Sequence, residues 1–299
     1  MILIGSGTFA KVYFDEEEQL VVRRSAIDCR VWREIPRHEN LLRLVKLTQT
    51  VNRDFLYYTE HYPNGDLFTF LAGQTTNPTP LYCLNMIRRI ARGVKALHDS
   101  HFAHRDIKLE NILLGKQFEP VLCDFDFLIR VDPNSTRRLH KRCGSVPYCA
   151  PEVLMAVEHD PRQSDCWSLG VVLYGIYFSR LPFDPPNIED GRKTDPHKRE
   201  REIVNRICGN QYDLPSNAKS YLESLLFKAI RGLLEPDPEL RLPVDGLLHL
   251  LKDVPECTLV PHAGYSMEPA EELVYIHGNK SDPTLIEIPS DPHGYTLIK

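Results

Sequence analysis

The stretch that decides the fold is His104-Arg105-Asp106-Ile107-Lys108-Leu109-Glu110-Asn111, which places an acid, a base and an amide in one short segment. Asp124-Phe125-Asp126 follows it, and Ala150-Pro151-Glu152 comes after a further basic stretch. Transfer of a phosphoryl group to a hydroxyl requires these residue types: a carboxylate that aligns the nucleophile, a cation at the phosphate, and an amide with a second carboxylate for Mg²⁺. A single tripeptide of this kind would mean little. Three such motifs in this order make a chance occurrence improbable.

Length and composition describe one two-lobed domain or two small ones. The 299 residues include 42% hydrophobic and 26% charged side chains, as in ordinary globular proteins. The net charge of −5 gives no reason to expect a nucleic-acid partner, and neither a membrane span nor a signal peptide is evident. The eight cysteines are scattered without a CxxC pair, which favours reduced thiols in the cytoplasm, with the nucleus as an alternative. The sequence does not indicate an oligomeric state.

Residues 1–61 predict a small β-rich lobe. Two alternating segments flank an acidic turn at residues 15–18 and indicate a hairpin. The predicted elements are strands at 11–15, 19–24, 41–50 and 55–61, with a short helix at 28–35 that ends before Pro36. Few residues precede Gly5, so we expect the strand before the hairpin to be nearly missing.

The hydrophobic period changes at Leu81. Apolar residues then recur at three- and four-residue steps as far as Leu97, which predicts an amphipathic helix. Further helices are predicted at about residues 163–178, 198–208, 218–234 and 244–251. The fold class is therefore α+β, with a β-rich lobe at 1–61 and a larger, mostly helical lobe at 62–254. Residues 255–299, rich in Pro, Gly, His and acidic side chains, are interpreted as a C-terminal tail.

Together these motifs resemble the eukaryotic-type protein kinase superfamily, of the Ser/Thr class, over about residues 3–252. Asp165-Cys166-Trp167-Ser168-Leu169-Gly170 is similar to a marker of its larger lobe, and Arg241 matches the arginine that pairs with Glu152. The resemblance implies a two-lobed fold, ATP and Mg²⁺ as cofactors, and a protein as the substrate.

The resemblance also implies catalytic roles for residues 104–111, the catalytic segment, and for nearby residues. Asp106 would orient the substrate hydroxyl and accept its proton, and Lys108 would neutralise the γ-phosphate. Asn111 and Asp124 would bind Mg²⁺, with Asp124 as the principal ligand. Leu113 would form the floor under adenine. A lysine two residues after Asp106 is typical of the Ser/Thr class.

Two further segments resemble nucleotide-binding parts of the family. Residues 5–12, GSGTFAKV, match its glycine-rich phosphate-covering loop, except that Ala10 replaces the third glycine. Residues 56–67 resemble the hinge, where the backbone of Glu60 and Tyr62 would hydrogen-bond adenine. Asp66 would reach the ribose, or cap the following helix, and the two roles are compatible. The implied nucleotide contacts are Gly5, Ser6, Gly7, Val12, Arg23, Glu60, Tyr62, Asp66 and Leu113.

The chain departs from the family where a strand lysine should meet the phosphates. Arg23 occupies that place, Lys11 on the neighbouring strand is an alternative, and a third alternative is that neither makes the contact. The glutamate that normally pairs with this lysine is not evident. Cys29 falls where it should lie, with Asp28 beside it, and Glu34, the only glutamate of the predicted helix, is interpreted as solvated surface charge.

The metal-binding motif and the activation segment also differ from the family. Asp126 replaces a glycine; it could weaken ATP binding or assist a second metal, but a solvent-facing side chain is the favoured interpretation. Ser145 lies where a Ser/Thr kinase bonds its catalytic aspartate and lysine. Lys141 stands where related kinases carry a phosphorylatable threonine, so switching by that route is not expected.

Two functions are consistent with these features. The favoured one is ATP- and Mg²⁺-dependent phosphoryl transfer to Ser/Thr hydroxyls of a protein, slowed by the missing lysine. The alternative is a pseudokinase that keeps the fold and acts as a scaffold or allosteric partner. Asp106, Lys108, Asn111 and Asp124 favour the enzyme, because a scaffold needs none of them. The changes among the predicted nucleotide-binding residues, such as Arg23 in place of a lysine and Asp126 in place of a glycine, favour the alternative.

Overall fold

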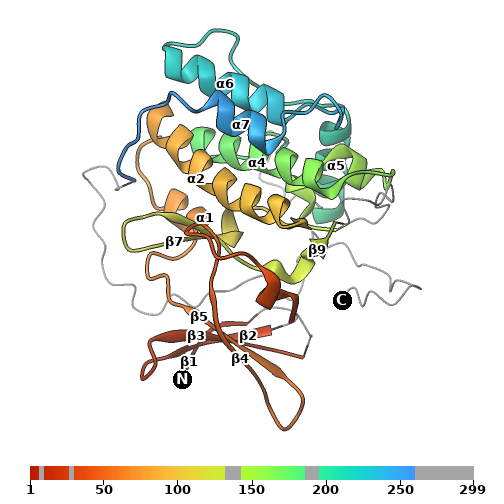
Figure 1. The fold of residues 1–299 in the computed structure, drawn as a ribbon. Helices are drawn as coiled ribbons and strands as arrows, with labels where there is room; N and C mark the ends of the chain where they lie inside the picture. Colours follow the sequence, from red (N-terminus) through yellow and green to blue (C-terminus); the bar gives the residue numbers. More distant parts are fainter. Residues whose placement is uncertain (7–9, 27–29, 132–142, 186–194, 260–299) are drawn as a thin grey trace.

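Five antiparallel strands form the smaller lobe of the computed structural model, which describes residues 1–6, 10–26, 30–131, 143–185 and 195–259. The strands are β1 (Ile2–Ser6), β2 (Ala10–Asp15), β3 (Leu20–Ser25), β4 (Leu44–Gln49) and β5 (Phe55–Glu60). Their order in the sheet is β1-β2-β3-β5-β4. Figure 1 shows this sheet below the helical lobe.

The first hairpin is confirmed, but the strand before it is longer than expected. β2 pairs with β3 along its whole length, from Ala10 opposite Ser25 to Asp15 opposite Leu20. The expectation that the preceding strand is nearly missing is wrong. β1 runs through Gly5 and pairs with β2, with one irregularity in the register. A few residues are enough here because an edge strand presents backbone groups ready for pairing.

The helical turn between β3 and β4 is shorter than predicted. It is a 3₁₀ helix, η1 (Arg30–Glu34), instead of a helix over 28–35, and residues 27–29 lie outside the described part. A segment this short, closed by Pro36, makes too few i to i−4 bonds to offset the cost of helix nucleation. Trp32 on η1 is buried, and its ring centroid lies 5.0 Å from that of Tyr57 on β5, which attaches the turn to the sheet.

Helices make up most of the larger lobe. They are α1 (Leu67–Ala72), α2 (Pro80–Asp99), α3 (Pro151–Leu154), α4 (Pro161–Phe178), α5 (Pro196–Cys208), α6 (Tyr221–Leu233) and α7 (Val244–Leu250). The five predicted helices correspond to α2, α4, α5, α6 and α7. The sequence did not predict α1 and α3, because helices this short give no periodic pattern. The two-lobed α+β fold is thus as predicted.

Capping residues determine where three of these helices begin. α2, α4 and α5 each start with a proline directly after a capping residue, which is Thr79, Asp160 and Asp195, respectively. Each capping side chain accepts a backbone N–H of the first turn. Proline suits the next position because it lacks an N–H that would otherwise have no helical partner.

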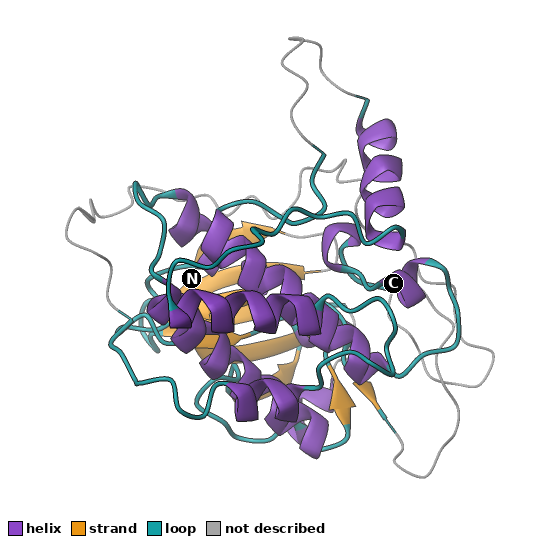
Figure 2. Ribbon diagram, turned by 90° about the horizontal axis from the view of Figure 1, so that it is seen from above, coloured by secondary structure: helices purple, strands orange, loops and turns teal. Residues whose placement is uncertain are grey.

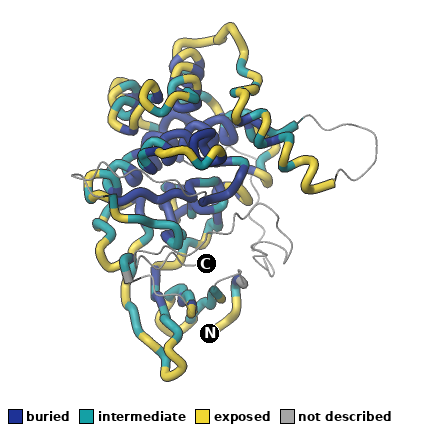
Figure 3. The backbone as a smooth tube through the Cα atoms, turned by 90° about the vertical axis from the view of Figure 1, so that its right-hand side faces the viewer, coloured by how far each residue is buried: buried dark blue, intermediate teal, exposed yellow. Residues whose placement is uncertain are grey.

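The hydrophobic core is concentrated in the larger lobe. α4 is buried along most of its length, and Trp167 on it has no exposed surface. Figure 3 shows the buried backbone gathered among the helices, while the sheet is mostly intermediate or exposed. In Figure 2 the helices lie in front of the strands. No helix in the described part of the chain is long and apolar enough to cross a bilayer.

Short strand pairs lie where the two lobes meet. β6 (Phe102–Ala103) pairs with β9 (Ile129–Arg130), and β7 (Ile112–Leu114) pairs with β8 (Pro120–Leu122). Leu42 of the smaller lobe donates its N–H to Leu122 O at 2.9 Å, and Leu122 donates to Asn40 O at 2.9 Å. The segment between β6 and β7 and the segment between β8 and β9 are therefore held side by side, next to the sheet.

Candidate active site

Asp165 on α4 holds the segment between β6 and β7 in place. Its fully buried carboxylate accepts the backbone N–H of His104 at 2.9 Å and of Arg105 at 2.8 Å, and lies 2.9 Å from His98 Nε2. Arg105 has φ of 69°, a left-handed conformation that is unfavourable for a large side chain. Hydrogen bonds to a charged group are among the strong ones and offset this cost. The turn that presents Asp106 is therefore fixed.

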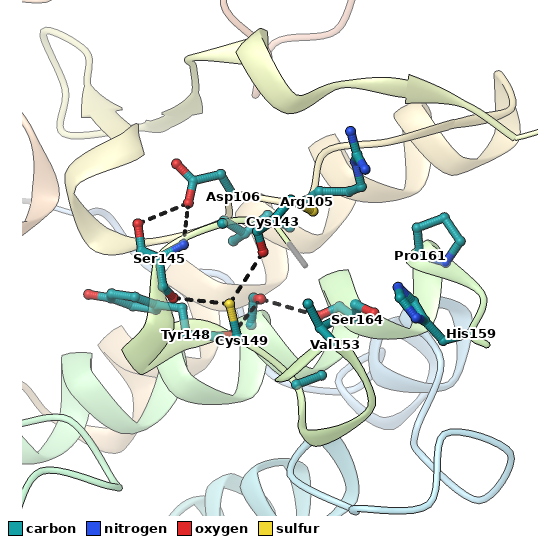
Figure 4. A pocket seen from close by; sticks show the side chains of 14 residues that line it. Arg105, Asp106, Cys143, Ser145, Tyr148, Cys149, Val153, His159, Pro161 and Ser164 are labelled. Carbon is teal, nitrogen blue, oxygen red and sulfur yellow. Dashed lines mark hydrogen bonds between the residues drawn. The ribbon is translucent and has the colours of Figure 1, made fainter. Parts of the chain in front are cut away.

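Asp106 is the centre of a hydrogen-bonded cluster. Ser145 donates its N–H and its hydroxyl to Asp106 Oδ1, each at 3.0 Å (Figure 4). Lys108 Nζ lies 3.0 Å from Asp106 Oδ2 and 2.9 Å from Ser145 Oγ. Asn111 donates its amide to the backbone carbonyl and to Oδ2 of Asp106, each at 2.9 Å. Three of the four residues predicted to be catalytic meet here, together with Ser145.

Charge in the cluster is set by the ion pair and by burial. Burial favours the neutral form of Lys108, but the negative charge of Asp106 and their hydrogen bond outweigh it and raise the pKa of the ammonium group. Burial raises the pKa of the thiols of Cys123, Cys143 and Cys149. These thiols are protonated at neutral pH, which excludes them as nucleophiles.

Asp124 lies beside the cluster, and one of its carboxylate oxygens accepts no hydrogen bond from the described residues. It has φ of 60°, which aspartate tolerates better than most residues. Cys123 donates its N–H to Asn111 O at 2.9 Å, which brings Asp124 next to the catalytic segment. Asp124 Oδ1 is buried without a hydrogen-bond partner among the described residues, 4.0 Å from Arg23 Nη2. Such an oxygen is suited to a hard cation.

Asp126 does not face solvent, so the favoured interpretation of this residue is wrong. Its side chain is 11% exposed and forms an ion pair with Arg23 Nη2. The reason is the 3₁₀ turn η3 (Phe125–Phe127), which buries Phe125 and leaves Asp126 beside β3. The left-handed residue of this motif is Asp124, not Asp126. Replacing glycine at 126 therefore carries no backbone penalty.

Strand register separates the two cations proposed for the phosphates. Lys11 on β2 lies directly opposite Arg24 on β3, one residue after Arg23. Residues directly opposite share a face of a sheet, and successive residues alternate between faces. Lys11 is therefore on the Arg24 face, where Arg24 pairs with Asp54 at 2.6 Å. Arg23 is the one that the structure brings to the aspartates described above.

Trp32 is a site residue that sequence reasoning missed. Its ring meets that of Phe125 edge-on at 5.5 Å, and the Arg23 guanidinium carbon lies 5.5 Å from its centroid. Phe125 in turn meets the His104 ring at 5.4 Å. The rings form a continuous contact from η1 to the catalytic segment. The available signal was a tryptophan inside the short predicted helix, because such a large apolar side chain is usually buried.

Glu34 is the last residue of η1 and lies at the surface. Its side chain is 51% exposed and forms an ion pair with Arg130 on β9. Its interpretation as surface charge agrees with this placement, although it has a partner. Asp28 and Cys29, the other positions considered for the missing glutamate, lie outside the described residues.

The predicted nucleotide contacts of the smaller lobe are partly described. Gly5 on β1 is paired with Val12 on β2, and Ser6 with Lys11, so these backbone positions are adjacent. Gly7 lies outside the described residues. The strands thus bring Gly5, Ser6 and Val12 together at one end of the sheet.

The hinge segment begins within β5, and Glu60 is the last residue of that strand. The Tyr62 hydroxyl donates to Glu60 Oε2 at 3.4 Å, and burial raises the pKa of Tyr62. Asp66 is the N-cap of α1 and accepts the N–H of Thr69 at 2.7 Å and its hydroxyl at 2.9 Å, so the capping role is confirmed. Leu113 on β7 forms an isolated bridge with Asp66. The hinge is therefore joined to the larger lobe beside the catalytic segment.

The segment after the basic stretch packs against Asp106. Gly144 has φ of 89°, and a Cβ there would lie 2.6 Å from Arg105 O, so only glycine fits without a shift. Glu152 pairs with Arg241 at 2.6 Å, as predicted. Lys141 lies outside the described residues.

Comparison against protein families finds a match over most of the chain. The model of the protein kinase domain matches residues 2–250. The chain belongs to the eukaryotic protein kinase superfamily.

Individual relatives are protein kinases that are longer than this chain. Over 242 residues, 77% of this chain, it is 34% identical to serine/threonine-protein kinase ppk16 of Schizosaccharomyces pombe, of which the match covers 34%. It is 33% identical to serine/threonine-protein kinase SIK1 of Mus musculus over 208 residues, 69% of this chain and 24% of that protein. It is 30% identical to CBL-interacting protein kinase 4 of Oryza sativa subsp. japonica over 266 residues, 82% of this chain and 55% of that protein. The chain thus matches between about a quarter and about half of each relative's length.

Proposed function

We propose that the chain transfers the γ-phosphoryl group of ATP, with Mg²⁺, to serine or threonine hydroxyls of a protein substrate. The observation that carries the proposal is the cluster around Asp106. Lys108 and Asn111 contact one carboxylate oxygen of Asp106, and Ser145 contacts the other. A carboxylate held on both oxygens beside a cation can orient a hydroxyl for attack.

Each cluster residue has a distinct role in this proposal. Asp106 aligns the substrate hydroxyl and accepts its proton. Lys108, kept charged by Asp106, stabilises negative charge on the transferred group. Ser145 fixes the side chains of Asp106 and Lys108 relative to each other, because its hydroxyl accepts from Lys108 and donates to Asp106.

The residues beside the cluster fit Mg²⁺. Magnesium prefers oxygen ligands, and the unpartnered buried Oδ1 of Asp124 is such a ligand. Asn111 contributes a second, neutral side chain on the adjacent segment. When bound, the metal would neutralise the charge of the phosphates.

Transfer of labelled phosphate from Mg²⁺-ATP to a basic protein tests the proposal. The purified full chain should label the substrate, and Asp106→Asn should reduce the rate by at least about 10²-fold, because a fixed base is removed. Asp99→Asn is the control, since it breaks only an exposed pair with Lys95 on α2. A wild-type chain that transfers no phosphate, or an Asp106→Asn chain that transfers it normally, would overturn the proposal.

A scaffold is the second candidate function. The observation that favours it is the Arg23–Asp126 ion pair, since Asp126 already engages the cation that phosphates need. A thermal-shift measurement separates the two, because a ligand that binds the folded state raises the melting temperature. The enzyme predicts a rise with Mg²⁺-ATP together with turnover. A nucleotide-binding scaffold predicts the rise without turnover, and a nucleotide-free scaffold predicts neither.

A further inference from the structure

Arg23 lies between an aromatic ring of the smaller lobe and a carboxylate of the larger lobe. Its Nη2 atom forms an ion pair with Asp126 Oδ2, and its guanidinium carbon is 5.5 Å from the Trp32 ring centroid. The side chains of Arg23 and Asp126 are only 14% and 11% exposed. Water and salt screen a pair this deep much less than a surface pair. The ring and the carboxylate therefore restrict where the guanidinium can lie.

The turn η1 does not supply this carboxylate. Glu34 is the acidic residue of η1, and it is half exposed and paired with Arg130 on β9. In the part of the chain that the structure describes, Arg23 forms an ion pair with Asp126 and lies 4.0 Å from Asp124. Both lie on the segment that follows β8, in the larger lobe.

Arginine is suited to such an arrangement. A guanidinium carries five N–H donors in a rigid fork, so an ion pair through Nη2 is compatible with a phosphate contact. At 4.0 Å, Asp124 is too far from Arg23 for a hydrogen bond but close enough for electrostatic attraction. The cation is thus placed beside the carboxylate that we assign to Mg²⁺.

We infer that Asp126 is a positioning residue that holds Arg23 for the nucleotide phosphates, so that the larger lobe supplies the anion for the strand cation. This inference rests on the proposed function, since it assigns Arg23 to a bound nucleotide. Asp126 acts through Arg23 and touches neither substrate nor metal. The opposite arrangement, in which Asp126 competes with phosphates for Arg23, is the outcome that the experiment must exclude.

A double-mutant cycle tests the inference on the full chain. The variants are Asp126→Asn, Asp126→Glu, Arg23→Ala and the double variant Arg23→Ala/Asp126→Asn. The dissociation constant of Mg²⁺-ADP and the kcat and KM for ATP are measured for each. Asp126→Asn should weaken Mg²⁺-ADP binding or lower kcat/KM about tenfold, as expected for loss of a hydrogen bond to a charged group. Asp126→Glu, which keeps the charge, should recover most of this loss.

The coupling between the two positions decides whether Asp126 acts through Arg23. Asp126→Asn should have little further effect in the Arg23→Ala background. Asp54→Asn is the matched control, because it breaks the ion pair of Arg24, the next residue on β3, and should leave the nucleotide constants unchanged. Equal effects of Asp126→Asn with and without Arg23 would overturn the inference, as would tighter nucleotide binding by Asp126→Asn.

The two proposals fail in different ways. A wild-type chain that binds Mg²⁺-ADP with full coupling but transfers no phosphate contradicts the proposed function alone. A chain that transfers phosphate with no coupling contradicts the role of Asp126 alone. A wild-type chain that binds no Mg²⁺-ADP contradicts both.

Discussion

Arg241 and Glu152 form a bidentate ion pair in the interior of the larger lobe. Nη1 lies 2.6 Å from Oε1 and Nη2 lies 2.9 Å from Oε2, with the side chains 0% and 4% exposed. Arg241 also donates to the carbonyls of Gln163, Glu235 and Pro236. The pair thus connects the start of α3 to the loop before α7 and to α4.

Breaking this pair on one side should destabilise the fold strongly. Arg241→Leu leaves the Glu152 carboxylate buried without its cation, which typically costs about 3–5 kcal/mol. Urea unfolding of the wild type and the variant measures the difference. Asp99→Asn, which breaks an exposed pair, should cost less than about 1 kcal/mol. An Arg241→Leu chain as stable as Asp99→Asn would contradict the structural role of the pair.

The segment after α7 should contribute to stability through Arg88 on α2. Arg88 is buried and donates to Val254 O at 2.7 Å and Leu251 O at 3.3 Å, and it forms an ion pair with the exposed Glu256. Arg88→Met keeps much of the apolar stem but leaves two buried carbonyls without this donor. We expect a loss of about 1–3 kcal/mol in the free energy of unfolding.

Glu256→Gln is the comparison for Arg88. Its carboxylate is 60% exposed, so the ion pairs that it forms with Arg88, Arg89 and Arg92 are screened by water and salt. It should cost less than about 1 kcal/mol, and less again at high salt. If Glu256→Gln were as damaging as Arg88→Met, surface charge and not the buried hydrogen bonds would attach this segment to α2.

The regular helices and the catalytic cluster could be predicted because their signals are local. The apolar residues of α2 recur at helical spacing within one continuous segment. Asp106, Lys108 and Asn111 likewise lie within six consecutive residues. Their side chains meet because a turn held by Asp165 brings them together. The sequence showed which residues these are, but not that Asp165 fixes the turn.

The environment of Arg23 could not be predicted, because it depends on contacts far apart in the chain. Asp126 is 103 positions away from Arg23 along the sequence, and no local pattern states that η3 leaves it beside β3. A solvent-facing aspartate is the ordinary expectation for an isolated charge. Trp32 was missed for the same reason, because its place in the site depends on ring contacts with Tyr57 and Phe125, which are distant in the sequence.

His159 should make the fold less stable in acid. Its ring is 1% exposed, and Nδ1 lies 2.8 Å from Val157 O. Burial lowers the pKa of His159 below its ordinary value of 6.5, and outweighs the hydrogen bond to Val157 and the charge of Glu152, which act in the opposite direction. The unfolded chain therefore binds a proton more readily than the folded chain between the lowered pKa and 6.5. Over that window, stability falls as the pH falls, by up to about 1.4 kcal/mol per pH unit.

His159→Gln isolates this contribution from those of other titrating groups. The free energy of unfolding is measured for both chains from pH 7.5 to pH 5. The difference between wild type and His159→Gln should be constant above the ordinary histidine pKa and should change in favour of the variant below it. A difference that does not vary with pH would show that His159 titrates alike in the folded and unfolded chains.

Ser145 should be needed for catalysis more than for folding. Its hydroxyl donates to Asp106 Oδ1 at 3.0 Å and accepts from Lys108 Nζ at 2.9 Å, so it aligns the base with the cation. Ser145→Ala should lower kcat by about 5- to 100-fold, the range for losing one or two such bonds, with little change in the KM for ATP. Ser145→Thr keeps the hydroxyl and should retain most of the activity.

The same change elsewhere in the larger lobe shows whether the effect is specific to the cluster. Ser168→Ala on α4 also removes a buried hydroxyl, which bonds the carbonyls of Tyr148 and Ser164. Ser168→Ala should lower the melting temperature with little change in kcat. Ser145→Ala should instead lower kcat with little change in the melting temperature. Because both serines are similarly buried, the contrast depends on the contact with Asp106. Equal kcat values for the two alanine variants would mean that the Ser145 hydroxyl does not align Asp106 and Lys108 during turnover.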